Sequence, residues 1–366
     1  MNPENRNMIL AITLSMAVLF GWQMFVVGPE LEKEAAMQQA IAEQEAAAAA
    51  ASGDAPQVDP DAVAGSAGAA ATGQLSASEA APAVEAPRIV IDAPLVSGSI
   101  SLAGLRVDDI MLKAYQQTQD PDSENIQFLL KTSTAAPFFA EFGWASADAA
   151  QPMPKSDSVW TASSMVLSPG SPVTLTWENG NGLTFRRQLS INDDYMITVD
   201  DSVESALSAP LTLFPYGLVR RHGTPATTGI YILHEGALGV FDETLREEDY
   251  DDMRDADGGV SEIRPEMPGG WIGFTDKYWL AALLPDQSAN MNFAFKSLAG
   301  PSDRYQVDYI ASEASVLPAG GVVSSQTRLF AGAKKVSLLD GYADELGIAN
   351  FDLAIDFGWF YFLTKP

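Results

Sequence analysis

The chain has 366 residues and a formal net charge of −27 at pH 7, a length that suffices for one large domain or two small ones. This charge argues against a nucleic-acid-binding protein, because phosphate contacts need clustered lysine and arginine. It argues equally against broad electrostatic docking on anionic lipid. The absence of cysteine excludes disulfides and cysteine-ligated zinc, and the only histidines are His222 and His234.

An almost entirely apolar run, 8–27, follows a short polar start, 1–7, that contains Arg6. About 20 apolar residues in a helix cross the hydrocarbon core of a bilayer. Trp22 and Phe25 lie near the far end, where interfacial aromatics are expected. We therefore predict a transmembrane helix at 8–27 with a cytoplasmic N-terminus. The predicted anchor residues are Met8, Leu10, Leu14, Leu19, Phe20, Trp22 and Phe25.

A cleaved signal peptide is the alternative for this segment. Its apolar core would span about 7–15 residues and end in a small-residue cleavage site. The run ends instead in "FVVGPELEKE", which has no such site beside it. The uncleaved anchor is therefore the favoured interpretation.

Residues 28–87 are rich in alanine, glycine, serine and proline, with few large apolar side chains. The first part, to about Ala51, has a helix-forming composition. The remainder cannot offset its ordering entropy by burial, so we predict a flexible tether. Recognition by a proline-binding partner is a weaker interpretation, because no clear P-x-x-P cluster occurs.

From Arg88 onward, short alternating or β-branched segments recur with turn residues between them, which predicts a β-sandwich or barrel over 88–350. Asn-Gly pairs at 179–182 predict a tight hairpin. One helix is expected at 334–346, where an apolar stripe is weakened by Gly341. The stripe consists of Val336, Leu339, Tyr342, Ala343 and Leu346.

His222, His234 and the neighbouring Glu235 supply the residue types for sugar acid–base chemistry. No local motif connects them, so a loop histidine and a strand-end histidine are the favoured interpretation. The acidic stretch 241–262 does not fit an EF-hand, because alignment on Asp255, Asp257 and Gly258 places Met253 first and Arg264 last. A solvated acidic loop is expected there. We predict no metal ion, cofactor or catalytic residue.

Two arginine pairs and one aromatic group have simple structural explanations. Arg186–Arg187 and Arg220–Arg221 resemble anion sites, but neighbours on a strand point to opposite faces. Trp271, Tyr278 and Trp279 resemble a ligand platform, but core packing is the default at strand spacing.

The last stretch, "FDLAIDFGWFYFLTKP", changes character at Gly358. Before it, Leu353, Ile355 and Phe357 alternate with polar or small residues, which predicts a final half-buried strand. After it comes a consecutive apolar run whose types favour the membrane interface, so the start of an interface helix is expected. The predicted interface residues are Trp359, Phe360, Tyr361, Phe362 and Lys365.

Three stretches together resemble the YidC membrane protein insertases of Gram-negative bacteria, part of the YidC/Oxa/Alb family. They are "NRNMILAITLSMAVLFGWQMF", "GGWIGFTDKYWLAALLP" and the final sixteen residues. The resemblance implies a mainly β, galactose-mutarotase-like supersandwich behind one transmembrane helix, with a short closing helix. It also implies an inner-membrane location with most of this chain in the periplasm.

The resemblance further implies a non-enzymatic function: help with the insertion and folding of integral membrane proteins, alone or with the Sec translocon. The implied partners are nascent membrane proteins, the translocon with its accessory subunits, and the lipid bilayer. The family's helical insertase core has no counterpart in these residues. Two alternatives remain open: an anchored periplasmic carbohydrate-binding or mutarotase-like sandwich, and a structural adaptor.

Overall fold

The computed structural model describes most of the chain after residue 85. The predicted anchor at 8–27, nearly all of the tether and the interface residues lie outside this part. Within it, no helix combines the length and apolar character needed to cross a membrane. The described residues are 86–120, 122–146, 148, 151–227, 233–298 and 302–356.

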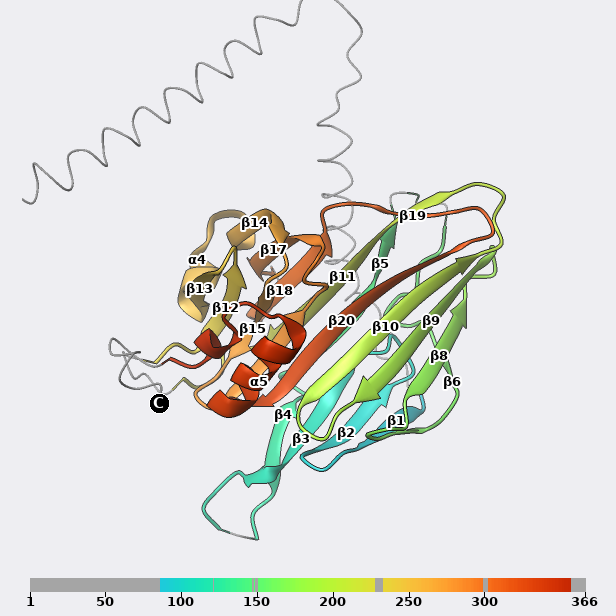
Figure 1. The fold of residues 1–366 in the computed structure, drawn as a ribbon. Helices are drawn as coiled ribbons and strands as arrows, with labels where there is room; N and C mark the ends of the chain where they lie inside the picture. The colour runs from blue at the N-terminus through green and yellow to red at the C-terminus, as the bar shows by residue number, and fades with distance from the viewer. Residues whose placement is uncertain are drawn as a thin grey trace, which may run out of the picture. The chain divides into compact units, whose positions relative to one another are not determined.

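Two large sheets form the body, and the described strands pair antiparallel apart from the parallel pair β1–β7. Figure 1 shows them as long twisted layers. The 11-stranded sheet has the order β14 (Val260–Pro268), β17 (Asn290–Ser297), β18 (Arg304–Ala311), β11 (Leu211–His222), β5 (Phe138–Ser146), β3 (Val107–Gln116), β2 (Val96–Ser101), β1 (Arg88–Asp92) and β7 (Val166–Leu167). Two further strands of this sheet are β4 (Asn125–Leu129), paired with β3, and β19 (Ser315–Leu317), paired with β11.

The second sheet has nine strands, and four short helical segments complete the body. Its order is β13 (Thr244–Asp249), β12 (Gly236–Phe241), β15 (Trp271–Thr275), β16 (Trp279–Leu284), β20 (Val322–Ala333), β10 (Met196–Ser205), β9 (Leu183–Ile191), β8 (Val173–Glu178) and β6 (Thr161–Ala162). The helical segments are α4 (Tyr250–Asp255), η2 (Asp257–Gly259), α5 (Val336–Leu346) and η3 (Phe351–Ala354).

The core lies between the sheets, and aromatic side chains contribute much of it. Phe138 on β5 packs edge-on against Phe274 on β15 of the other sheet, with ring centroids 6.3 Å apart. Tyr250 stacks on the same Phe274 ring at 6.0 Å. Such pairs add to the burial of their apolar area. The prediction of a mainly β sandwich is therefore confirmed.

The predicted hairpin at 179–182 joins β8 to β9. The Asn179 side-chain oxygen accepts hydrogen bonds from the backbone amides of Asn181 and Leu183, at 2.7 and 2.9 Å. Gly180 and Gly182 have φ angles of 73° and 93°, which residues with a side chain rarely adopt. Local turn chemistry therefore fixes the register of this hairpin.

The predicted closing helix is α5, which begins at Val336 rather than at residue 334. Leu339 and Tyr342 are its buried residues, as the stripe predicted. The Asn192 side-chain amide donates to the Tyr342 hydroxyl at 2.6 Å, and Gly347 ends the helix in a left-handed conformation. In Figure 1, α5 follows the end of β20 and lies at the same end of the body as the β3–β4 hairpin.

The predicted final strand from residue 351 is wrong. Asn350 adopts a left-handed conformation, and residues 351–354 then form the 3₁₀ turn η3. Phe351 is fully buried, with its ring 5.4 Å from Trp271 and 5.7 Å from Phe330. Asp352 and Ala354 are also buried, whereas the predicted inward residues Leu353 and Ile355 are only partly covered. Burial of the Phe351 ring in the core therefore determines the conformation of this segment more strongly than its alternating apolar pattern does.

Among the described strands, both sheets end in strands poorly suited to further pairing. β14 has two register irregularities against β17, and Pro265 and Pro268 lack backbone N–H donors. β13 carries the sequence TLREED, with Arg246, Glu247 and Asp249 exposed. The opposite edges, β6 and β7, contain two residues each. These are recognised ways to protect a sheet edge.

Candidate functional site

Both sets of site residues predicted from the sequence lie outside the described residues. These are the anchor residues from Met8 to Phe25 and the interface residues from Trp359 to Lys365. Within the body, the first candidates for a site are the buried charged side chains, which are costly unless paired.

A row of charged and amide side chains crosses the 11-stranded sheet on the face turned away from the core. On β18, Val307 joins the core, whereas Gln306 and Asp308 point the other way. Arg220 donates to the Gln306 side-chain oxygen at 2.9 Å, and Gln306 donates to Asp308 at 2.6 Å. Lys296 binds the same carboxylate at 2.8 Å. This row, which we call the polar band, connects β11, β18 and β17.

The polar band continues on β5. Arg106 donates to the Glu141 carboxylate at 2.8 Å, and its guanidinium lies 4.6 Å from the centre of the Phe139 ring. The Tyr216 hydroxyl donates to the other Glu141 oxygen at 3.4 Å. Burial, reinforced by the Glu141 charge, raises the pKa of Tyr216, so this hydroxyl remains a neutral donor.

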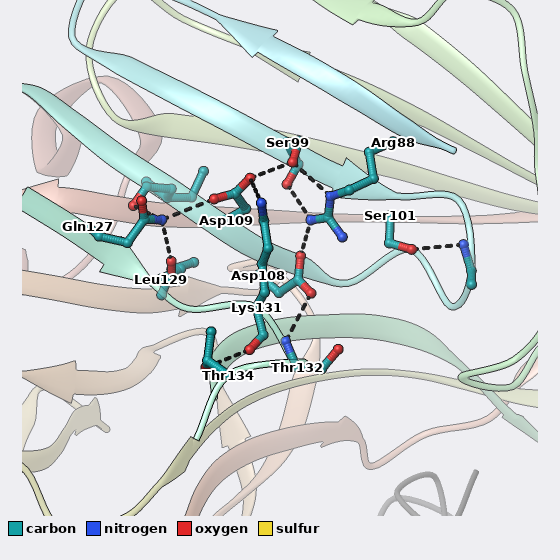
Figure 2. A network of polar contacts seen from close by, with 12 residues as sticks. Arg88, Ser99, Ser101, Asp108, Asp109, Gln127, Leu129, Lys131, Thr132 and Thr134 are labelled. Carbon is teal, nitrogen blue, oxygen red and sulfur yellow. Dashed lines mark hydrogen bonds and ion pairs between the residues drawn. The ribbon is translucent and has the colours of Figure 1, made fainter. Parts of the chain in front are cut away.

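A third cluster ties the first strand of the body to its neighbours (Figure 2). Arg88 donates to the Ser99 hydroxyl at 2.7 Å and forms an ion pair with Asp108, whose side chain is almost fully buried. The Ser99 hydroxyl donates to Asp109. Gln127, Lys131 and the backbone amide of Thr132 supply the remaining contacts to these two aspartates, at 3.0, 3.2 and 3.3 Å.

One further ion pair lies between the sheets. Arg187 binds Asp201 through two nitrogens at 2.7 Å each, and also donates to the Phe142 carbonyl of the opposite sheet at 2.9 Å. Burial lowers the pKa of Arg187, but the Asp201 charge and hydrogen bond outweigh it and raise the pKa. The clusters described so far place each carboxylate against a cation, so none of these buried carboxylates is left uncompensated.

The residues of the carbohydrate alternative lie at the end of β11 (His222) and just before β12 (His234 and Glu235). The His222 ring lies 6.3 Å from the Phe139 ring. His234 contacts the Ala237 carbonyl at 2.8 Å, and Glu235 accepts a hydrogen bond from the Lys277 backbone amide at 3.1 Å.

A shallow groove of about 480 Å³ lies over four strands of the nine-stranded sheet. Gln326 donates to Asp200 there at 2.6 Å. Its lining is polar, whereas small-molecule pockets are mostly apolar with a few polar groups. The lining includes Thr174, Arg186, Gln188, Asp200, Ser324 and Gln326.

The arginine pairs separate as predicted. The Arg187 side chain is 3% exposed and that of Arg186 is 50% exposed, because neighbours on β9 face opposite ways. The acidic stretch forms β13, α4 and η2 rather than a loop, and Asp249 caps α4. No group of three or more acidic or histidine side chains within the described ranges is placed to hold a metal ion.

The prediction that these aromatic side chains pack in the core is confirmed for Trp271, which is fully buried. It is wrong for Tyr278, which is 58% exposed. Tyr278 lies in the β15–β16 turn beside Lys334, whose amide donates to the Tyr278 carbonyl at 2.9 Å. The Lys334 ammonium donates to Thr275 at 2.7 Å. Burial lowers the pKa of Lys334 to about 8, against the opposing charges of Asp276, Glu235 and Asp356. In the sequence, the only signal of this lysine is the "KK" before the helix.

Comparison with known proteins gives one family. A family model described as the YidC periplasmic domain matches residues 88–366. The "Membrane protein insertase YidC" of Beijerinckia indica subsp. indica is 43% identical, over 100% of this chain and 60% of the relative. The protein of that name from Rickettsia bellii is 38% identical, over 100% and 62%. The chain thus spans about three fifths of the length of these curated relatives.

Among solved structures, a galactose mutarotase-like protein from Lactobacillus casei aligns with a TM-score of 0.43 and 13% identity. The alignment covers 67% of this chain and 99% of that chain. Likeness of this degree supports no inference about fold or activity.

Proposed function

Because the chain belongs to the YidC family, whose periplasmic-domain model matches residues 88–366, we propose that it is the anchor and periplasmic domain of a membrane protein insertase. The observation that carries the proposal is this match together with 43% identity to a curated insertase over the whole chain. Its substrates are nascent integral membrane proteins, and its partners are the Sec translocon with its accessory subunits and the lipid bilayer.

The location follows from the apolar run at 8–27, which serves as a transmembrane helix in the bacterial inner membrane. Arg6 precedes the run and Lys33 follows it at a distance. Positive residues close to the N-terminal end favour a cytoplasmic N-terminus, so the body stands in the periplasm. Residues 28–87 connect the anchor to the first strand as a tether.

The proposed task needs no covalent chemistry. An unsatisfied backbone polar group in hydrocarbon costs several kcal/mol, so an insertase acts by providing a polar route for short hydrophilic segments. In this proposal the body stands in the periplasm and provides contacts for the partners of the insertase.

A chimera tests the proposal. Residues 1–366 replace the matching part of the Beijerinckia indica relative, and the product is reconstituted in liposomes. We expect insertion of a single-span substrate, measured by protection from added protease, at a rate close to that of the unmodified relative. A chimera that reconstitutes in full but inserts no substrate overturns the proposal. A second chimera that lacks residues 88–350 measures how much of the insertion rate depends on the body.

The carbohydrate alternative has its own test. The chain is incubated with single sugar anomers, and their interconversion is followed by NMR. We expect the uncatalysed rate. Faster conversion that disappears in His222→Ala or His234→Ala would replace the non-enzymatic function with a mutarotase activity.

A further inference from the structure

A small aromatic and basic surface surrounds the β15–β16 turn. We define the Tyr278 tip as Lys277 and Tyr278 from this turn, Trp279 at the start of β16, Lys335 before α5, and Tyr115 from β3. Three lysines, counting the partly buried Lys334 beneath it, gather here in a chain whose net charge is −27. Tyr278 is among the most exposed large apolar side chains of the described body, at 58%.

Contacts between these side chains fix the geometry of the tip. Tyr115 packs edge-on against Trp279 with ring centroids 4.9 Å apart. The Lys277 ammonium lies 4.9 Å from the centre of the Tyr278 ring, and that of Lys335 lies 6.0 Å from the Tyr115 ring. The ammonium groups of Lys277 and Lys335 thus each lie beside an aromatic ring, which is a favourable arrangement for a cation.

The tip lies beside the end of β20. Trp279 pairs with Ala333 across β16 and β20, immediately before Lys334. Lys335 then leads into α5, which begins at Val336. Regular elements of the body therefore carry the side chains of the tip.

We propose that the Tyr278 tip docks on the headgroup layer of the membrane, with Tyr278 and Trp279 among the headgroups and Lys277 and Lys335 on lipid phosphates. This inference rests on the membrane anchoring in the proposed function. Tyrosine and tryptophan prefer the bilayer interface, and lysine reaches phosphates while its stem packs on apolar surface. Asp276 precedes Lys277 in the turn, and Glu235 accepts a hydrogen bond from the Lys277 backbone amide, so these carboxylates reduce the positive field of the tip. Insertion of aromatic rings among the headgroups, rather than long-range electrostatic attraction, therefore holds the tip at the membrane.

The absence of cysteine makes a site-specific test direct. Lys277→Cys, which keeps both aromatic rings of the tip, carries a nitroxide label on the full chain in nanodiscs of phosphatidylethanolamine and phosphatidylglycerol. We expect several-fold lower collision with an aqueous nickel complex, and higher collision with oxygen, than for a label at Val316→Cys. Val316 is the matched control, because it is 62% exposed and lies on β19, away from α5 in Figure 1. Lys335→Cys gives a second measurement of accessibility if Lys277→Cys misfolds.

The outcomes separate the docking from the anchoring. If the chain floats with liposomes but labels at positions 277 and 316 are equally accessible to nickel, the docking is overturned and the anchor stands. A chain that does not float overturns both. Protection at position 277 that persists in lipid-free amphipol shows burial by protein and also overturns the docking. Protection that needs lipid and survives raised salt supports it.

Discussion

Arg187 on β9 and Asp201 on β10 form a bidentate ion pair in the interior, and Arg187 also donates to the Phe142 carbonyl of the facing sheet. One guanidinium thus binds three oxygens from two layers of the sandwich. The Arg187 and Asp201 side chains are 3% and 11% exposed. Water can therefore replace few of these contacts if one partner is lost.

We expect Arg187→Met to lower the free energy of unfolding by about 3–5 kcal/mol, because the Asp201 carboxylate would stay buried without its cation. Urea unfolding followed by circular dichroism measures the change. Arg186→Met is the matched control, since Arg186 is the next residue on the strand and forms an exposed ion pair with Glu204. Its loss should stay below about 1 kcal/mol. Equal losses in the two variants would contradict the role given to burial.

Phe351 anchors the end of the body, and Phe351→Ala should cost about 3–5 kcal/mol of stability through the cavity left beside Trp271 and Phe330. Leu353→Ala is the comparison, because Leu353 is only partly covered in η3. In a strand the two side chains would share a face, and their losses would be similar. A clearly smaller loss for Leu353→Ala, measured by the same urea unfolding, supports the 3₁₀ turn.

Lys334 gives the body a defined pH dependence. Burial lowers its pKa from 10.5 to about 8, so between these values the unfolded chain binds more protons than the folded one. The stability contributed by this residue therefore rises with pH across that window, by about 2 kcal/mol from pH 7 to pH 9.5. Lys334→Met should remove this rise, which is measured as the difference between variant and parent at the two pH values. An unchanged pH profile in the variant would exclude Lys334 as its source.

Gly341 is the weak point of α5, and a Cβ at this position would meet no atom within 4 Å. Gly341→Ala should raise the free energy of unfolding by about 0.5–1 kcal/mol, because alanine loses less backbone entropy in a helix. Gly332→Ala is the opposite control, since its Cβ would lie 2.1 Å from the Tyr195 side chain. A destabilised Gly341→Ala variant would show that the helix position is constrained by something other than propensity.

Local signals in the sequence were sufficient for the hairpin at 179–182 and for the apolar stripe of α5. In both, the residues that determine the structure are neighbours in the chain: Asn179 caps its own turn, and Leu339 and Tyr342 share one helix face. The strand predicted after Asn350 was wrong because the conformation of this segment depends on the site in the core where Phe351 packs. That site is formed by Trp271 and Phe330, which lie far away in the sequence.

The polar band was beyond prediction for the same reason. Arg106 and Glu141 are 35 positions apart, and Lys296 and Asp308 are 12 apart, so their pairing needs the strand register. The exposure of Tyr278 was missed because the "GGW" stretch follows the strand pattern through Thr275 before the turn interrupts it. Aromatic residues within a turn deserve a separate prediction from those within strands.

The protected edges of the sheets affect how copies of this domain behave near one another. On the proposed function, copies share one membrane surface and collide far more often than molecules free in solution. An open strand would allow such collisions to polymerise the domains, sheet onto sheet. The prolines and irregular register of β14, and the exposed charges of β13, make these encounters unproductive. Crowding in the plane of the membrane therefore does not join these domains through the edge strands β13 and β14.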